Sequence, residues 1–313
     1  MACIDPLTIR NPRYKPTKKN GGIVPPLPDP GLAYIQVPCG RCIECRRRRS
    51  TDWRFRMHME YKYANHRKFH FLTLTFAREK FEQLRLDLSK IQKDISDEQV
   101  CKLALRRFNE RYRKKYGKAL RHLFVTDIGD DDNHIHLHGI IVGCRCGSYS
   151  RGKFKADIDT LRELWSYGFI WIGWCNERSI SYILKYVMKS DPRRPDFRPK
   201  IFVSPGFGKD YCQDPAVRDW HNQDEGRYYA ITSSGHRISL PRYYRLKLFT
   251  EEQLLQRSIK LVNNPPPLVF RGQKFADPGE YATFVQYKYE QSLKLGTSYA
   301  KRKKIGENPE FDY

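Results

Sequence analysis

Residues 133–142 read NHIHLHGIIV, an alternation of polar and apolar side chains that ends in an aliphatic run. Side chains of a β-strand point alternately to its two faces, so His134, His136 and His138 are predicted to share one face. The apolar residues between them then point into a core. Neutral imidazoles bind divalent metals well, so the shared face indicates a metal site. Exposed or hydrogen-bonded histidines without a metal are the alternative.

The regions on either side of this strand predict a mixture of strands and helices. Further strands are predicted over residues 69–76, 123–128, 169–174 and within 235–244, with the turn GDDDN at 129–133. Helices are predicted from residue 50, over 97–116, near 157–166 and near 181–190. Helices interspersed among such strands indicate an α+β fold with an antiparallel sheet and flanking helices.

A second motif, SYILKYVMK at residues 181–189, lies on the last of these helices. At about 100° per residue, Tyr182, Lys185, Tyr186 and Lys189 fall on one helix face and the aliphatic residues fall on the other. Two phenols one turn apart suit attack on a phosphate, because nearby lysines favour the phenolate and hold a phosphodiester. The alternative is a pair of tyrosines that rim a core beside solvated lysines.

A cysteine-rich segment, PCGRCIEC at residues 38–45, lies near the N-terminus. Thiolates at this spacing are typical of zinc or iron–sulfur ligation. A closed site needs a fourth ligand, which Cys3 can supply if the intervening arm folds back. The candidate ligands of a structural Zn²⁺ are Cys3, Cys39, Cys42 and Cys45. Cys144 and Cys146 are a rival pair, and thiols without a metal are the alternative.

The charge of the chain indicates a polyanionic partner. Lys and Arg number 58 against 35 Asp and Glu, which gives a net charge of +23 that would be self-repulsive without such a partner. Nucleic acid is the first candidate, an anionic membrane is the second, and an inert basic surface is the alternative. No stretch is long and apolar enough to span a bilayer, and no secretory signal is predicted, so we expect a reducing cytoplasm.

The domain organisation follows from composition and motif order. Residues 1–50 are predicted to form a Pro- and Lys-rich arm with the cysteine cluster, 51–245 a catalytic domain, and 246–313 a C-terminal extension. The arginines predicted to contact DNA phosphates are Arg46, Arg47, Arg48, Arg49, Arg106 and Arg107. For the helix over 97–116, a solvated charged face is the alternative to DNA contact.

Taken in order, these motifs resemble the HUH endonucleases, in which two histidines flank a hydrophobic residue. The likeness covers roughly residues 1–245 and is particularly to the replication initiators of microviruses, of the gokushovirus-like branch. The features that carry it are the cysteine cluster with its basic residues, FLTLT at 71–75, VTDIG at 125–129, HLHGII at 136–141, YILKYVMK at 182–189, SPGFG at 204–208 and LPRYY at 240–244.

The resemblance implies an antiparallel-sheet HUH domain of the Rep type with a catalytic Mg²⁺ or Mn²⁺. The histidine pair of the family is followed by a small residue and an aliphatic run, which selects His136 and His138 and leaves His134 as an extra. Asp127 stands where the family often has Glu, so it is the candidate third ligand.

The paired tyrosines of the family correspond to Tyr182 and Tyr186, with Lys185 and Lys189 as supporting cations; Lys185, between the tyrosines, is the better candidate. The implied reaction nicks and rejoins single-stranded DNA through a 5′-phosphotyrosine link and leaves a 3′-hydroxyl. It would start and end rolling-circle replication of a small phage genome in the host bacterial cytoplasm. The implied partners are the phage origin and the host replication helicase and polymerase, with no membrane.

Two other functions remain open at this point. A zinc hydrolase would use His134, His136 and His138 together, and the tyrosines would be dispensable. A non-enzymatic nucleic-acid-binding or packaging protein would depend on charge alone, and its metals would be structural.

Overall fold

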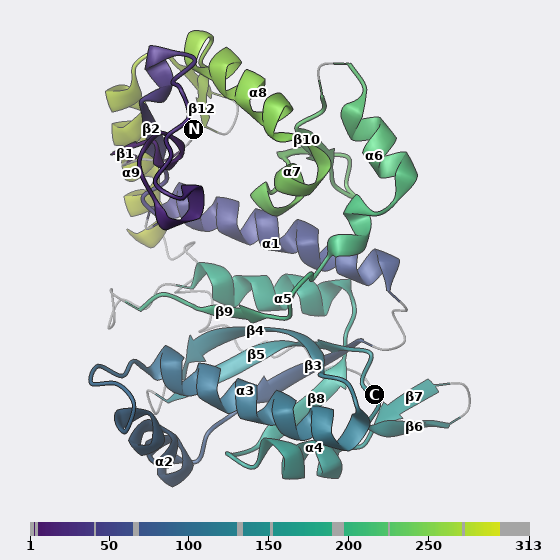
Figure 1. Cartoon of the computed structure of the whole chain (residues 1–313). Coiled ribbons are helices and arrows are strands. Elements are labelled where there is room, and N and C mark those ends of the chain that lie inside the picture. Colours follow the sequence, from purple (N-terminus) through teal and green to yellow (C-terminus); the bar gives the residue numbers. More distant parts are fainter. Residues whose placement is uncertain are drawn as a thin grey trace. The chain divides into compact units, whose positions relative to one another are not determined.

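The computed structural model describes residues 3, 6–40, 42–64, 69–129, 134–150, 153–189, 197–224, 226–270 and 273–294. The chain divides into two compact units, one of Met1–Asp52 with Cys212–Tyr313 and one of Trp53–Tyr211 (Figure 1). The predicted boundary at residue 50 lies close to this division, whereas residues 212–245, predicted within the catalytic domain, group with the arm. The functional division into arm, catalytic domain and extension stays a prediction.

A five-stranded sheet forms the centre of the 53–211 unit. Its strand order is β8-β3-β5-β4-β9, and every neighbouring pair is antiparallel. The strands are β3 (Phe69–Leu74), β4 (Arg121–Ile128), β5 (Ile135–Val142), β8 (Ile170–Trp174) and β9 (Ile201–Val203). The antiparallel sheet and the α+β class are confirmed, and the HUH assignment stays a prediction. Residues 130–133 of the predicted turn lie outside the described residues.

Helices cover both faces of this sheet. On one face, α2 (Arg78–Ser89), α3 (Asp97–Tyr116) and α4 (Ile158–Trp165) pack against Leu72, Leu74, Phe124, Leu137 and Ile141. On the other face, α5 (Glu177–Met188) and Met57 of α1 (Ile43–Tyr63) pack against Phe71, Leu123, Val125 and Ile140. Figure 1 shows α3 and α4 on one side of the sheet and α5 on the other. The α5 face is the one that carries the histidines.

Local capping sets the helix ends. The helix α3 matches its predicted range, because Ser96 provides a capping box and Gly117, at φ 74°, ends it in a left-handed conformation. The helix α5 begins four residues earlier than predicted, because the Asn176 side chain accepts a hydrogen bond from the Ser179 backbone N–H. The helix α1 also begins before the predicted residue 50, so it contains the arginine run.

The SPGFG motif, residues 204–208, is held by a buried ion pair. Arg121 of β4 donates two hydrogen bonds to the carboxylate of Glu60, which is 3% exposed. The same guanidinium donates to the Gly206 carbonyl at 2.9 Å, and the Gly208 N–H donates to Glu60. The motif therefore closes around α1 and β4 for structural reasons.

The other unit contains short strand pairs and helices. The strand pairs are β1 (Leu7–Arg10) with β2 (Tyr34–Val37), β10 (Tyr229–Ile231) with β11 (Arg237–Ser239), and β12 (Leu268–Phe270) with β13 (Gln273–Phe275). Its α-helices beyond α1 are α6 (Pro215–Asn222), α7 (Arg242–Leu248), α8 (Glu251–Asn263) and α9 (Pro278–Lys294). The prediction of an extended arm was wrong, because β1 pairs with β2 and folds the segment back on itself.

Smaller elements complete the described chain. The strands β6 (Gly147–Ser150) and β7 (Lys153–Ala156) pair with each other. The 3₁₀ helices are η1 (Pro12–Tyr14), η2 (Lys18–Asn20), η3 (Pro30–Leu32) and η5 (Lys209–Cys212). The strand predicted within 235–244 is limited to β11, because α7 starts directly after Pro241. None of the helices in the described ranges combines the length and the apolar composition that a membrane span needs.

Candidate active site and cysteine centre

Polar side chains gather on the α5 face where β4 ends and β5 begins. Asp127 lies directly opposite His136 across the two strands, and His138 is two residues further along β5 on the same face. The alternation predicted from the sequence is present, since Ile135 next to His136 is buried on the other face. Thr73 of β3, opposite His138, lies with its hydroxyl 3.0 Å from His138 Nδ1.

Thr73 was missed in the sequence analysis. The alternation of FLTLT places it on the same face as Phe71, and antiparallel pairing of that strand with HLHG would have brought it to His138. Its hydroxyl fixes the orientation of the His138 ring, as partners of ligand histidines commonly do.

A lysine and a buried carboxylate form the charged part of the site. Lys189 Nζ lies 2.6 Å from Asp127 Oδ1 and donates to the Ile128 carbonyl at 2.9 Å. His138 Nε2 lies 3.8 Å from the other oxygen of Asp127, whose side chain is 5% exposed. Lys189 therefore reaches the carboxylate, whereas Lys185, the candidate favoured from the sequence, is exposed.

The two tyrosines of α5 contact each other and the strand. The Tyr186 ring stacks on His138 with centroids 4.2 Å apart and an interplanar angle of 7°. The Tyr186 hydroxyl donates a hydrogen bond to the Tyr182 hydroxyl, and the two rings are nearly perpendicular at 5.2 Å. Lys185 Nζ lies 5.5 Å from the Tyr182 ring centroid. Tyr186 is 8% exposed, so the tyrosine face of α5 turns toward the sheet rather than toward solvent.

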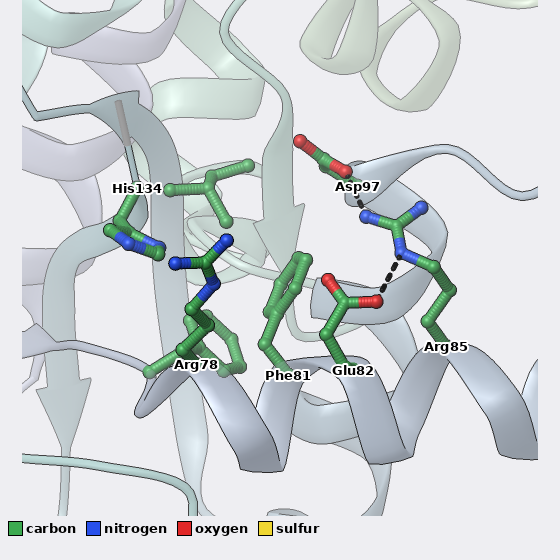
Figure 2. Close-up of a pocket in the computed structure, with 8 residues that line it drawn as sticks. Arg78, Phe81, Glu82, Arg85, Asp97 and His134 are labelled. Carbon is green, nitrogen blue, oxygen red and sulfur yellow. Dashed lines mark hydrogen bonds and ion pairs between the residues drawn. The ribbon is translucent and has the colours of Figure 1, made fainter. Parts of the chain in front are cut away.

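The three histidines do not act as one cluster. His136 and His138 have ring centroids 6.5 Å apart. His134 precedes β5 and lines a pocket with Arg78 and Phe81 instead (Figure 2). Among the described residues, the cysteine cluster alone has three or more His, Cys, Asp or Glu ligand atoms all within 4.8 Å of one another. This arrangement gives no support to a zinc centre of three histidines.

The cysteine cluster consists of Cys3, Cys39, Cys42 and Cys45. Its sulfurs lie 3.5 Å apart for Cys3 and Cys45, and 3.9 Å apart for Cys3 with Cys42 and for Cys39 with Cys45. Four sulfurs at about 2.3 Å from one tetrahedral ion would be roughly 3.8 Å apart, so the spacing fits a metal. Backbone N–H groups of Cys39, Cys42 and Cys45 point at cluster sulfurs. Burial raises the pKa of the Cys45 thiol, so a cation is needed to favour its thiolate.

The rival pair has other contacts. Cys144 donates to the Cys146 carbonyl at 3.5 Å, and Cys146 donates to the Asp157 carbonyl at 3.3 Å. Tyr112 donates to Cys144 at 3.9 Å. These contacts are internal to the 53–211 unit, and none of the nine cysteines, all of them described, forms a disulfide.

The arginines predicted to contact DNA are partly engaged with the protein. Arg47 pairs with Glu44 at 2.8 Å, and burial lowers the pKa of Arg49. On α3, Arg107 pairs with Asp87 at 2.7 Å and Arg106 with Glu110 at 3.6 Å. Because α3 covers the sheet face opposite α5, its arginines are not brought together with the histidines and tyrosines.

Comparison with known proteins gives a consistent family. Residues 69–191, from β3 to just beyond α5, match the family model of the replication-associated proteins of the ORF2 type. Similar proteins include Replication-associated protein ORF4 of Chlamydia phage 1, which is 26% identical over 67% of this chain and 52% of its own length. The chain thus spans about half of that relative.

Two further relatives are matched over most of their length. Replication-associated protein VP4 of Bdellovibrio phage phiMH2K is 23% identical over 82% of both chains. Replication-associated protein ORF2 of Spiroplasma virus 4 is 26% identical over 81% of this chain and 82% of its own. No solved structure matches. The resemblance to phage replication initiators that the motifs predicted is confirmed.

Proposed function

We propose that this protein nicks and rejoins single-stranded DNA at a phage replication origin through a 5′-phosphotyrosine link. Its similarity to replication-associated proteins of small phages indicates replication initiation. The observation that carries the finer proposal is the stack of Tyr186 on His138, together with the hydrogen bond between the Tyr186 and Tyr182 hydroxyls. Two potential nucleophiles thereby share one place beside the histidine strand.

The reaction requires a phenol oxygen to attack phosphorus while the bond to the 3′ oxygen breaks. The products are a 5′-phosphotyrosine and a strand with a free 3′-hydroxyl, which a host polymerase can extend behind a host helicase. The second tyrosine repeats the attack after one round of synthesis, and the freed 3′-hydroxyl then displaces a tyrosine to close the circle. Each step exchanges one phosphodiester for another, so no ATP is needed.

The residues at the sheet end fit the catalytic Mg²⁺ or Mn²⁺ that the resemblance implies. His136 and His138 would hold it, with Asp127 as the third ligand, since two imidazoles and a carboxylate share one face. Such an ion would supply positive charge to the scissile phosphate. Lys189, at 2.6 Å from Asp127, provides a fixed cation in the same place.

The cysteine cluster is proposed to hold one structural Zn²⁺. Four thiolates in a closed set, with no open position, are typical of structural rather than catalytic zinc. Its function is then to hold the segment that contains Cys3 against the start of α1.

Covalent capture tests the proposal. The full chain is incubated with Mn²⁺ and end-labelled single strands that tile the phage genome, then boiled in detergent and separated by electrophoresis. We expect a labelled protein–DNA adduct that is absent from the Tyr182→Phe/Tyr186→Phe double variant. The control is Tyr287→Phe, which alters an exposed tyrosine of α9. Cleavage at full rate without an adduct would favour a hydrolase and contradict the proposal.

Histidine variants test the register. His136→Ala and His138→Ala should each abolish the adduct while DNA binding persists, because binding depends mainly on Lys and Arg contacts with phosphate. His134→Ala is the matched control and should retain the adduct. Loss with His134→Ala and retention with His136→Ala would show that the wrong histidine pair was chosen.

A further inference from the structure

A pocket of about 290 Å³ lies where β3 ends and β5 begins. Ile135 lines it, and the next residue along β5 is His136 of the candidate site. Neighbouring strand residues face opposite sides of a sheet, so the pocket and the site lie on opposite faces of one strand end. His134, in the pocket, is two residues from His136, roughly 7 Å along an extended strand. A single strand of DNA could therefore reach both.

The floor of the pocket is aromatic. Phe76 and Phe81 are each 8% exposed, and their rings meet edge to face with centroids 5.0 Å apart. Phe81 stands between Arg78 and Glu82 in Figure 2. Flat aromatic rings of this kind provide packing surfaces for nucleobases.

One end of the pocket presents carboxylates held in place. Arg85 donates to Asp97 at 2.6 Å, to the Ile95 carbonyl at 3.2 Å, and contacts Glu82 at 3.4 Å (Figure 2). The guanidinium fork is thus used within the protein. Each carboxylate contacts Arg85 through one oxygen, so its second oxygen is available to accept a hydrogen bond from a ligand.

The other end of the pocket presents a cation. Arg78, the first residue of α2, makes no ion pair with any acid in the part of the chain that the structure describes, and its side chain is exposed. Figure 2 shows its guanidinium beside His134. A fixed pair of acceptors, an aromatic floor and an uncommitted arginine therefore lie within one small pocket.

We propose that this pocket holds one unpaired base of the DNA substrate, a base with an exocyclic amino group. Carboxylates accept from such amino groups, and arginine binds phosphate, so Glu82 and Asp97 would select the base while Arg78 holds its backbone. The volume is at the lower limit of ordinary small-ligand sites, which suits one base rather than a longer segment. The identity of the substrate rests on the proposed function.

Binding of four oligonucleotides to the full chain tests this proposal without divalent metal. The probes are a fluorescein-labelled thymidine decamer and three decamers with a central cytidine, adenosine or guanosine. Because thymine has no exocyclic amino group, we expect at least one of the three to bind roughly fivefold to tenfold tighter than the thymidine decamer. Glu82→Gln should reduce this preference to less than about twofold, and Arg78→Ala should weaken all four probes about equally.

Matched controls come from α4, which carries an exposed pair, Arg162 with Asp159 at 3.1 Å. Asp159→Asn should keep the base preference, and Arg162→Ala should keep the overall affinity. Equal binding of all four probes, or a preference that survives Glu82→Gln, would overturn the pocket assignment. A base preference in a protein that forms no tyrosine adduct would keep the pocket and refute the nicking reaction. An adduct without a base preference would do the reverse.

Discussion

The two tyrosines of α5 are chemically unequal. Tyr182 is half-buried and its oxygen accepts a hydrogen bond from Tyr186, which itself is packed under His138. A hydrogen bond donated to an oxygen favours its anionic form. Tyr182 is therefore the better first nucleophile, and Tyr186 becomes available once Tyr182 has been consumed.

Single tyrosine variants should separate these roles. We expect Tyr182→Phe to slow the first adduct by a factor on the order of one hundred, the lower range for loss of a positioned reactive group. Tyr186→Phe should form the first adduct but close few circles, because the second transfer lacks its nucleophile. Single-turnover gels measure the adduct, and circular products are counted after exonuclease digestion. The reverse order of effects would exchange the two roles.

Lys189 and Lys185 offer a matched pair of lysine variants. Lys189 faces the buried Asp127 carboxylate, so Lys189→Ala should lower the free energy of unfolding by about 3 to 5 kcal/mol, as for other broken buried pairs. Lys185 is exposed, and Lys185→Ala should change it by less than about 0.5 kcal/mol. Urea denaturation compares the two. Equal effects would mean that the ion pair contributes nothing to stability.

At the scale of elements, the sequence predicted what local chemistry determines. Both ends of α3 were predicted because Ser96 and Gly117 are strong capping signals. The strand β9 was missed because three residues carry little periodic signal, and it exists by pairing with β4. The β1–β2 pair was missed for a similar reason, since each strand is short and its partners, such as Leu7 and Val37, lie far apart in the sequence.

The Glu60–Arg121 pair is predicted to hold three elements together. Glu60→Gln removes the charge that Arg121 and the Gly208 N–H both contact, so we expect a loss of about 3 to 5 kcal/mol in the free energy of unfolding. Glu110→Gln is the control, because that carboxylate is 53% exposed and pairs with Arg106 at 3.6 Å. A urea midpoint that is equal for both variants would contradict the structural role assigned to the SPGFG motif.

At the scale of the whole molecule, the sequence located the chemistry better than its contacts. Alternation placed His136 and His138 on one face, and pairing with β4 then added Asp127. The choice between Lys185 and Lys189 could not be made from helical periodicity, because it depends on how α5 is rotated against the sheet. The pocket beside His134 was not predicted, since it needs α2 and α3 to meet the end of β5.

Zinc content tests the cysteine centre. Protein purified without chelator should contain about one zinc per chain, as structural sites bind one ion with four ligands. Cys39→Ser/Cys42→Ser should lose it, whereas Cys144→Ser/Cys146→Ser should retain it. Elemental analysis of the three proteins makes the comparison. Absence of zinc from the wild-type protein, or its loss only from the second variant, would contradict the assignment.

The most direct test of the nicking proposal is to locate the DNA on the protein. Trypsin cuts after Arg178, Lys185 and Lys189, so it separates SISYILK, which contains Tyr182, from YVMK, which begins with Tyr186. The adduct formed with Mn²⁺ is digested with nuclease and trypsin, and the peptides are identified by mass spectrometry. We predict a nucleotide phosphate on SISYILK in the first-nick adduct and none on YVMK. A nucleotide on neither peptide, with cleavage intact, would contradict the account.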